Sequence, residues 1–147
     1  MESEKATTLI QPPTADAGFC IDDFTDIASA DFEIKHPVTD APTGIVVQIA
    51  GPENPRRKKM QFARVRKMRN ATAKAGMLKL QDPADEEEDE TDFLAACILG
   101  WNKMPTATGN MTYSAQAARD LMADPERRWL RSQIKSFVEE REAFIAG

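Results

Sequence analysis

The chain is poor in the residues that build most catalytic and metal centres. It has one histidine, His36, and two cysteines, Cys20 and Cys97. A structural zinc site needs three or four such ligands at close spacing, and these three residues lie far apart in the sequence. No glycine-rich phosphate loop, dinucleotide fingerprint or nucleophile-elbow motif is present. We therefore predict a protein that is not an enzyme and has no catalytic residues, metal or cofactor.

Long apolar runs are also missing. No stretch of the chain approaches the roughly 18 apolar residues of a membrane-spanning helix. The first residues, Met1–Lys5, are acidic rather than basic and are not followed by an apolar run, so they do not resemble a secretory signal. The two cysteines fit reduced thiols. Together these absences predict a cytoplasmic protein that does not bind a membrane.

Positive charge is in the minority overall but is concentrated in one segment. Nineteen Lys and Arg face 24 Asp and Glu, for a net charge of −5. Ten of the cations fall within residues 56–79, and eight acids follow within 82–92. Because opposite charges in tandem can pair, and because aromatic residues do not alternate with the cations, we favour charge pairing over nucleic-acid binding. The acidic run lacks the spacing and the glycine of a calcium loop.

The N-terminal half predicts a β-hairpin followed by a helix. Residues 32–36 alternate apolar and polar side chains, residues 45–50 are rich in β-branched residues, and turn formers occupy 37–44. Asn54 and Pro55 fit the start of a helix that continues to about residue 75, where Gly76 would end it. The acidic residues 1–31 predict a weakly ordered arm, interrupted by an apolar cluster at 19–27 that could dock on the body or on a partner.

The C-terminal half predicts three short helices. In the first helix, one apolar stripe contains Leu94, Cys97, Ile98 and Trp101. Pro105 and Gly109 would end this helix. Ser114 would cap the second helix, and Asp124 the third. We therefore predict an α+β fold with four segments: an acidic, weakly ordered arm (1–31), a β-hairpin and basic amphipathic helix (32–81), an acidic linker (82–91) and a helical part with a three-helix bundle (92–147).

An isolated hairpin is marginally stable, so its apolar face must be covered. We hypothesise that this face and the apolar stripe of the basic helix form a partner-binding groove with a charged rim. The groove residues would be Ile45, Val47, Ile49, Met60 and Met68, and the rim residues Arg56, Arg57, Lys58, Lys59 and Arg64. The hairpin edge would also permit self-association.

Two pieces of the sequence resemble tail assembly chaperones of long-tailed, siphovirus-type bacteriophages. The first is the turn His36-Pro37-Val38-Thr39 with Pro42-Thr43-Gly44, followed by Ala50-Gly51-Pro52-Glu53-Asn54-Pro55 before the basic helix. The second contains Phe93-Leu94, Gly100-Trp101, Tyr113-Ser114, Ala117, Ala118, Leu121, Trp129, Gln133, Phe137 and Phe144. The similarity covers about residues 32–147.

This resemblance implies a chaperone that binds the phage tape-measure protein, keeps it soluble and helps to recruit tail-tube protein. Its location would be the cytoplasm of the infected bacterial host. Two alternatives stay open at this point. The first is a structural virion protein, such as a head decoration, head–tail connector or minor tail protein. The second is a nucleic-acid-binding regulator acting through residues 56–79, whose binding would be strongly salt-dependent.

Overall fold

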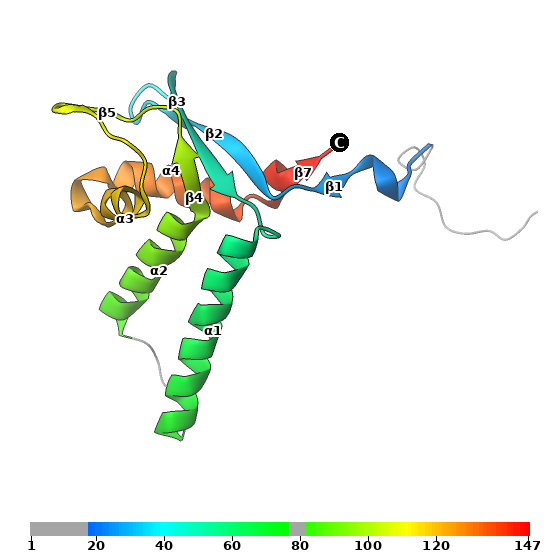
Figure 1. The fold of residues 1–147 in the computed structure, drawn as a ribbon, viewed down its shortest axis with the longest axis vertical. Helices are drawn as coiled ribbons and strands as arrows, with labels where there is room; N and C mark the ends of the chain where they lie inside the picture. Colours follow the sequence, from blue (N-terminus) through cyan, green and yellow to red (C-terminus); the bar gives the residue numbers. More distant parts are fainter. Residues whose placement is uncertain (1–17, 77–81) are drawn as a thin grey trace, which may run out of the picture.

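A three-stranded antiparallel sheet organises the computed structural model, which describes residues 18–76 and 82–147 (Figure 1). The sheet has the order β2 (Ser29–Lys35), β3 (Pro42–Ala50) and β4 (Ile98–Trp101). The helices are α1 (Pro55–Ala75), α2 (Pro83–Cys97), α3 (Ala115–Ala123) and α4 (Arg128–Glu139). Two short two-stranded pairs accompany this sheet. Strand β1 (Thr25–Asp26) pairs with β7 (Ile145–Ala146), and β5 (Pro105–Thr106) pairs with β6 (Gly109–Asn110). The mixed helix and strand content agrees with the predicted class.

The predicted hairpin is present, with both strands longer than expected. Phe32 pairs with Val47 and Ala30 with Ile49, so these residues share one face of the sheet. Val47 and Ile49 are fully buried in one core with residues of α2, α3 and α4. In the connecting loop, Nδ1 of His36 accepts hydrogen bonds from the backbone N–H groups of Val38 and Thr39, each at 3.1 Å. His36 is therefore a turn residue.

The basic helix begins and ends where the sequence predicts. The side chain of Asn54 accepts a hydrogen bond from the backbone N–H of Arg56, and Pro55 takes the first helical position, where no intrahelical N–H is needed. Gly76 ends the helix with a φ of 73°, a left-handed conformation that suits glycine. The helix extends away from the sheet beside α2 (Figure 1).

The first C-terminal helix ends earlier than predicted. It ends at Cys97, and Ile98 to Trp101 form β4, which pairs with β3. The helical stripe was wrong for Ile98 and Trp101 because the open edge of β3 offers backbone partners that a periodicity argument does not include. Pro105 and Gly109 consequently belong to the β5–β6 hairpin. Because β4 lies in the same sheet as the hairpin, residues from both sides of the acidic segment share one core.

The predicted acidic linker is also wrong, because residues 83–91 form the first part of α2. Asp82 caps this helix by accepting from the backbone N–H of Ala84, and Pro83 starts it. Asp85 and Glu86 lie in the first turn, where the helix dipole stabilises negative charge. Cations of α3 and α4 pair with acids of α2 and so reduce the repulsion between its carboxylates.

The described part of the predicted arm, residues 18–31, has defined structure, whereas residues 1–17 lie outside the described range. A 3₁₀ turn at Ile21–Asp23 precedes β1, and Ser29 already belongs to β2. The backbone N–H of Ile27 donates to the carbonyl of Phe144 at 2.9 Å, which fixes this segment to the C-terminal end of the chain. Close packing at this point requires Gly51, since a Cβ there would lie 2.7 Å from the carbonyl oxygen of Ile27.

The third predicted helix is divided into three parts. A 3₁₀ turn at Pro125–Arg127 leads into α4, and a second one at Arg141–Phe144 leads into β7. Asp124 caps the first turn as predicted, and Ser114 caps α3. Helices α2, α3 and α4 pack on one another. Among the described residues, no helix is long and apolar enough to span a membrane.

Candidate partner-binding groove

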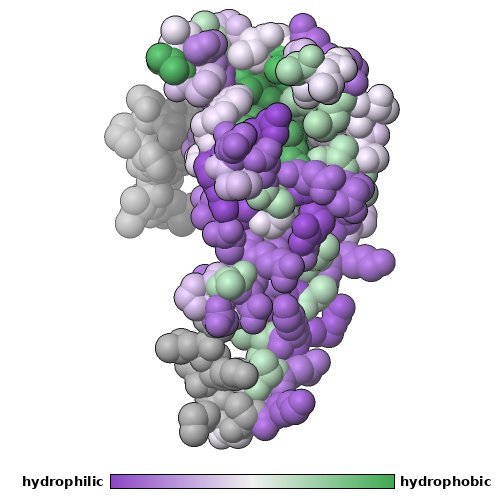
Figure 2. Space-filling view, turned by 90° about the vertical axis from the view of Figure 1, so that its left-hand side faces the viewer, coloured by the Kyte–Doolittle hydropathy of each residue, from purple (hydrophilic) through white to green (hydrophobic). Residues whose placement is uncertain are grey.

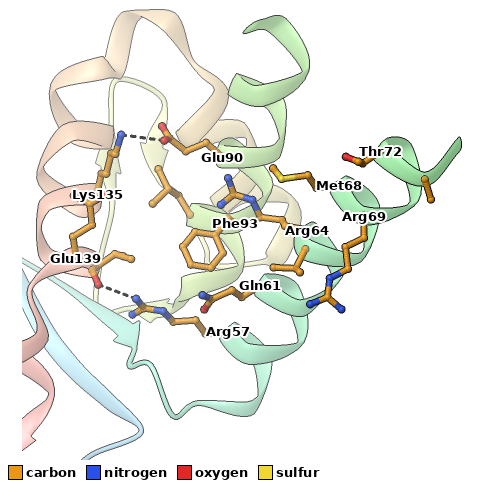
Figure 3. Close-up of a pocket in the computed structure, with 14 residues that line it drawn as sticks. Arg57, Gln61, Arg64, Met68, Arg69, Thr72, Glu90, Phe93, Lys135 and Glu139 are labelled. Carbon is orange, nitrogen blue, oxygen red and sulfur yellow. Dashed lines mark hydrogen bonds and ion pairs between the residues drawn. The ribbon is translucent and has the colours of Figure 1, made fainter. Parts of the chain in front are cut away.

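A groove of about 930 Å³ runs between the exposed flank of α1 and the helices α2 and α4 (Figure 3). Val65 and Met68 of α1 line one wall, Phe93 and Leu94 of α2 form the floor, and Val138 lies on the α4 side. Met68 is 57% exposed and Val65 44%. The other lining residues are polar or small: Arg57, Gln61, Arg64, Arg69, Thr72, Ala73, Glu90, Lys135 and Glu139. The groove thus combines an apolar centre with a charged rim.

Arg57 holds the first turns of α1 against the body of the protein. Its guanidinium donates to the carbonyls of Ala50 at 2.9 Å and Val138 at 3.0 Å. The same group lies 5.7 Å from the ring centroid of Phe93 and 5.8 Å from that of Phe144. These contacts connect β3, α1 and α4, so this cation has a structural role at the end of the groove next to the sheet.

Arg64 and Glu90 set the charge beside the apolar floor of the groove. Figure 3 shows Arg64 extending from α1 across Phe93, and its guanidinium lies 5.2 Å from that ring centroid. Glu90 forms ion pairs with Arg131 at 2.9 Å and Lys135 at 3.0 Å. Burial opposes ionisation of Glu90, but the hydrogen bonds from Arg131 and Lys135 outweigh it and lower the pKa of this carboxyl. The negative charge of Glu90 is therefore neutralised by Arg131 and Lys135, whereas Arg64 and Arg69 keep the α1 wall of the groove cationic.

The acidic residues of α2 pair mainly with α3 and α4 rather than with the basic helix. Arg119 contacts Asp92 at 2.7 Å and Glu88 at 3.6 Å, and Arg128 contacts Glu87 at 2.7 Å. Among the described residues, the ion pair between α1 and α2 is Lys67 with Asp89 at 3.0 Å. Within residues 56–76 and 82–92, Lys67 and Asp89 thus provide an ion pair of the predicted kind. Figure 2 shows that polar surface predominates in the middle and lower part of this face, whereas the most apolar surface lies in the upper part.

The structure separates the residues predicted to bind a partner. Val47 and Ile49 are fully buried under the helices, and Ile45 packs against the same core. The hypothesis that these three form an open groove is therefore wrong for this conformation, because the helices of the same chain already cover the hairpin face. Met68 does line the groove, whereas Met60 is half-buried outside it.

The predicted rim is divided in the same way. Arg57 and Arg64 line the groove. Arg56 instead donates to the hydroxyl of Tyr113 at 3.2 Å, and Lys58 pairs with Glu53 at 2.7 Å. Lys59 is exposed on α1 outside the groove.

Sequence reasoning missed most of the groove, above all Arg69, Phe93 and Lys135. The positions of Arg57, Gln61, Arg64, Met68 and Thr72 follow one another at intervals of three or four residues. This spacing marks one continuous helix face and could have been detected. The contributions of α2 and α4 could not, because they depend on how those helices pack beside α1.

No protein-family model, no curated protein and no solved structure matches this chain. Within residues 18–76 and 82–147, no group of three or more His, Cys, Asp or Glu side chains is arranged to hold a metal ion.

Proposed function

We propose that this protein is an assembly chaperone that holds an apolar helical segment of another protein in the groove beside α1. In the role suggested by the sequence resemblance, the partner is the tape-measure protein of a siphovirus-type phage, and the complex helps to recruit tail-tube protein. The observation that carries the proposal is the groove itself, with Val65 and Met68 exposed above Phe93.

The shape of the groove suits a helix as its occupant. Helix α1 has 21 residues, which corresponds to a length of about 31 Å. An amphipathic helix lying along this wall would place side chains from successive turns against Val65, Met68 and Phe93. Methionine adapts to irregular partners, which suits a chaperone that must hold several similar segments. The cations on the rim would keep such a complex hydrated.

Groove variants test this proposal. Full-length chain and tape-measure protein are co-expressed, and the amount of complex recovered is measured with wild type, Met68→Glu and Val65→Glu. Burying a side chain of this kind is worth about 1.5–3 kcal/mol, and the introduced carboxylate would have to lose water when the partner binds, so we expect each variant to bind about tenfold more weakly or worse.

Phe62→Glu is the matched control. Phe62 is 55% exposed on the same helix but does not line the groove. This variant therefore introduces the same charge and should bind the partner as tightly as wild type does. Equal binding by wild type, Met68→Glu and Val65→Glu would reject the groove as the site. Circular dichroism of each variant checks that its helix content equals that of wild type. A stoichiometric signal from this chain in mass spectra of purified particles would instead support a structural virion protein.

Binding of nucleic acid is the second candidate, and the charge distribution favours considering it. Glu87, Glu88, Glu90 and Asp92 of α2 pair with cations of α3 and α4, whereas Asp89 pairs with Lys67 of α1, so several of the acids on α2 are already engaged by cations of other helices. Residues 77–79 of the predicted basic segment lie outside the described residues. A gel-shift assay at about 50 mM salt, where phosphate contacts are strong, tests this candidate, and the absence of a shift would exclude it.

A further inference from the structure

We propose that residues 19–24 of one copy of this protein, here called the arm tip, dock in the groove of a second copy. The arm tip exposes three large apolar side chains: Phe19 is 56% exposed, Ile21 80% and Phe24 53%. The rings of Phe19 and Phe24 stack with centroids 6.1 Å apart. A cluster of this kind on a monomer typically marks an interaction surface.

The structure presents the arm tip in a defined conformation. The backbone N–H of Cys20 donates to the carboxylate of Asp23 at 3.2 Å. In return, the backbone N–H of Asp23 donates to the carbonyl of Cys20 at 3.0 Å. Just after it, β1 pairs with β7, and Asp26 lies 3.5 Å from Arg141. The segment is therefore ordered before it binds, which lowers the entropy cost of docking.

Charge and polarity of the arm tip are complementary to those of the groove. Residues 18–31 contain four aspartates and no Lys or Arg. Asp22 and Asp23 lie between the apolar residues Ile21 and Phe24 in the sequence, and on α1 Arg64 and Arg69 flank Val65 and Met68. Docking would bring the carboxylates to the cationic wall and the apolar side chains to Phe93 and Met68.

A second copy is the occupant that the anchoring of the arm favours. In Figure 1 the segment before β1 leads away from the sheet on the side of the C-terminus, while α1 extends in another direction. To enter its own groove, the arm tip would have to leave the β1–β7 pairing. Because arm tip and groove are different surfaces, the contact is heterologous, and each copy can both give an arm and receive one.

Such docking would place the arm tip where the proposed function places the partner helix. Self-association would then cover the apolar groove until a partner displaces the arm tip. The self-association itself does not depend on the proposed function, and it is measured on the chain alone.

Two variants with complementary defects test the arm-in-groove contact by sedimentation velocity on the full-length chain. Ile21→Asp damages the arm tip and leaves the groove intact, whereas Met68→Glu does the reverse. We expect wild type to associate as its concentration rises. Each variant alone should associate at least about tenfold more weakly than wild type. An equal mixture of the two is expected to form a 1:1 dimer, because one intact arm tip and one intact groove remain.

Val38→Asp is the matched control, because Val38 is 85% exposed on the hairpin loop and takes no part in the proposed contact. A wild type that stays monomeric, a mixture that stays monomeric, or variants that associate as wild type does would each overturn the inference. Ile21→Asp also separates the two proposals, since it should still bind the tape-measure protein. If the partner binds the groove and wild type is monomeric, the self-association fails and the proposed function stands.

Discussion

Replacing Arg131 with alanine should destabilise the protein more than the loss of any exposed ion pair. Arg131 is 5% exposed and lies between three helices. Its guanidinium donates to the hydroxyl of Thr91 at 2.6 Å, to the carbonyl of Met122 at 3.0 Å and to Glu90 at 2.9 Å. These bonds link α4 to α2 and α3, so one side chain satisfies polar groups on both neighbouring helices.

The magnitude follows from the groups that the substitution leaves behind. Removing one partner of a buried ion pair costs about 3–5 kcal/mol, because the other polar groups lose their partner while remaining buried. Glu90 is 31% exposed and keeps Lys135, which places the estimate at the lower end. We expect a loss of about 3 kcal/mol in the free energy of unfolding, or a fall in Tm of about 9 °C for a chain of this size.

Urea denaturation followed by circular dichroism measures this loss, with Arg119→Ala as the control. Arg119 also pairs with two carboxylates of α2, but it is 36% exposed, so its removal should cost less than about 1 kcal/mol. A cost below about 1 kcal/mol for Arg131→Ala, or equal costs for the two variants, would refute the reasoning that burial makes Arg131 the central connection between the helices.

Two further predictions concern titration. The pKa of Glu90 is lower in the folded protein than the ordinary glutamate value of about 4.3. The stabilisation by this carboxylate should therefore be complete above the ordinary pKa and should be lost as the pH falls through the folded pKa. Acid unfolding of Glu90→Gln should depend less on pH than that of wild type, and identical profiles would contradict this. Burial raises the pKa of the Cys97 thiol to about 11. In a Cys20→Ser background, this thiol should therefore react with a thiol reagent only after denaturation, and rapid reaction of the folded protein would be evidence against its burial.

The acidic segment illustrates how tertiary packing changes the meaning of a charge pattern. Eight acids within residues 82–92 repel one another, which is why a linker was predicted. In the folded chain, Arg119, Arg128 and Arg131 bring cations from α3 and α4 to these acids. The cations come from up to 41 residues away in sequence. Local reasoning could not include them.

The groove shows the same division between local and tertiary information. The face of α1 that lines it is encoded in the spacing of Arg57, Arg64 and Met68, but the floor comes from Phe93 of α2. The predicted site at Val47 and Ile49 failed because the same apolar side chains that could bind a partner are used by the core of the chain itself.

The local elements were determined by the sequence alone. Asn54 and Gly76 set the limits of α1, Ser114 starts α3, and the alternation around Val47 predicts a strand with one buried face. These features depend on hydrogen bonds and φ angles within a few residues, so neighbouring positions suffice to predict them. The tertiary structure decided the strand conformation of Ile98–Trp101, the helix at Pro83–Cys97 and the position of the groove. In each case the stabilising partner is a strand edge, a cation or an apolar side chain that only the folded chain brings close.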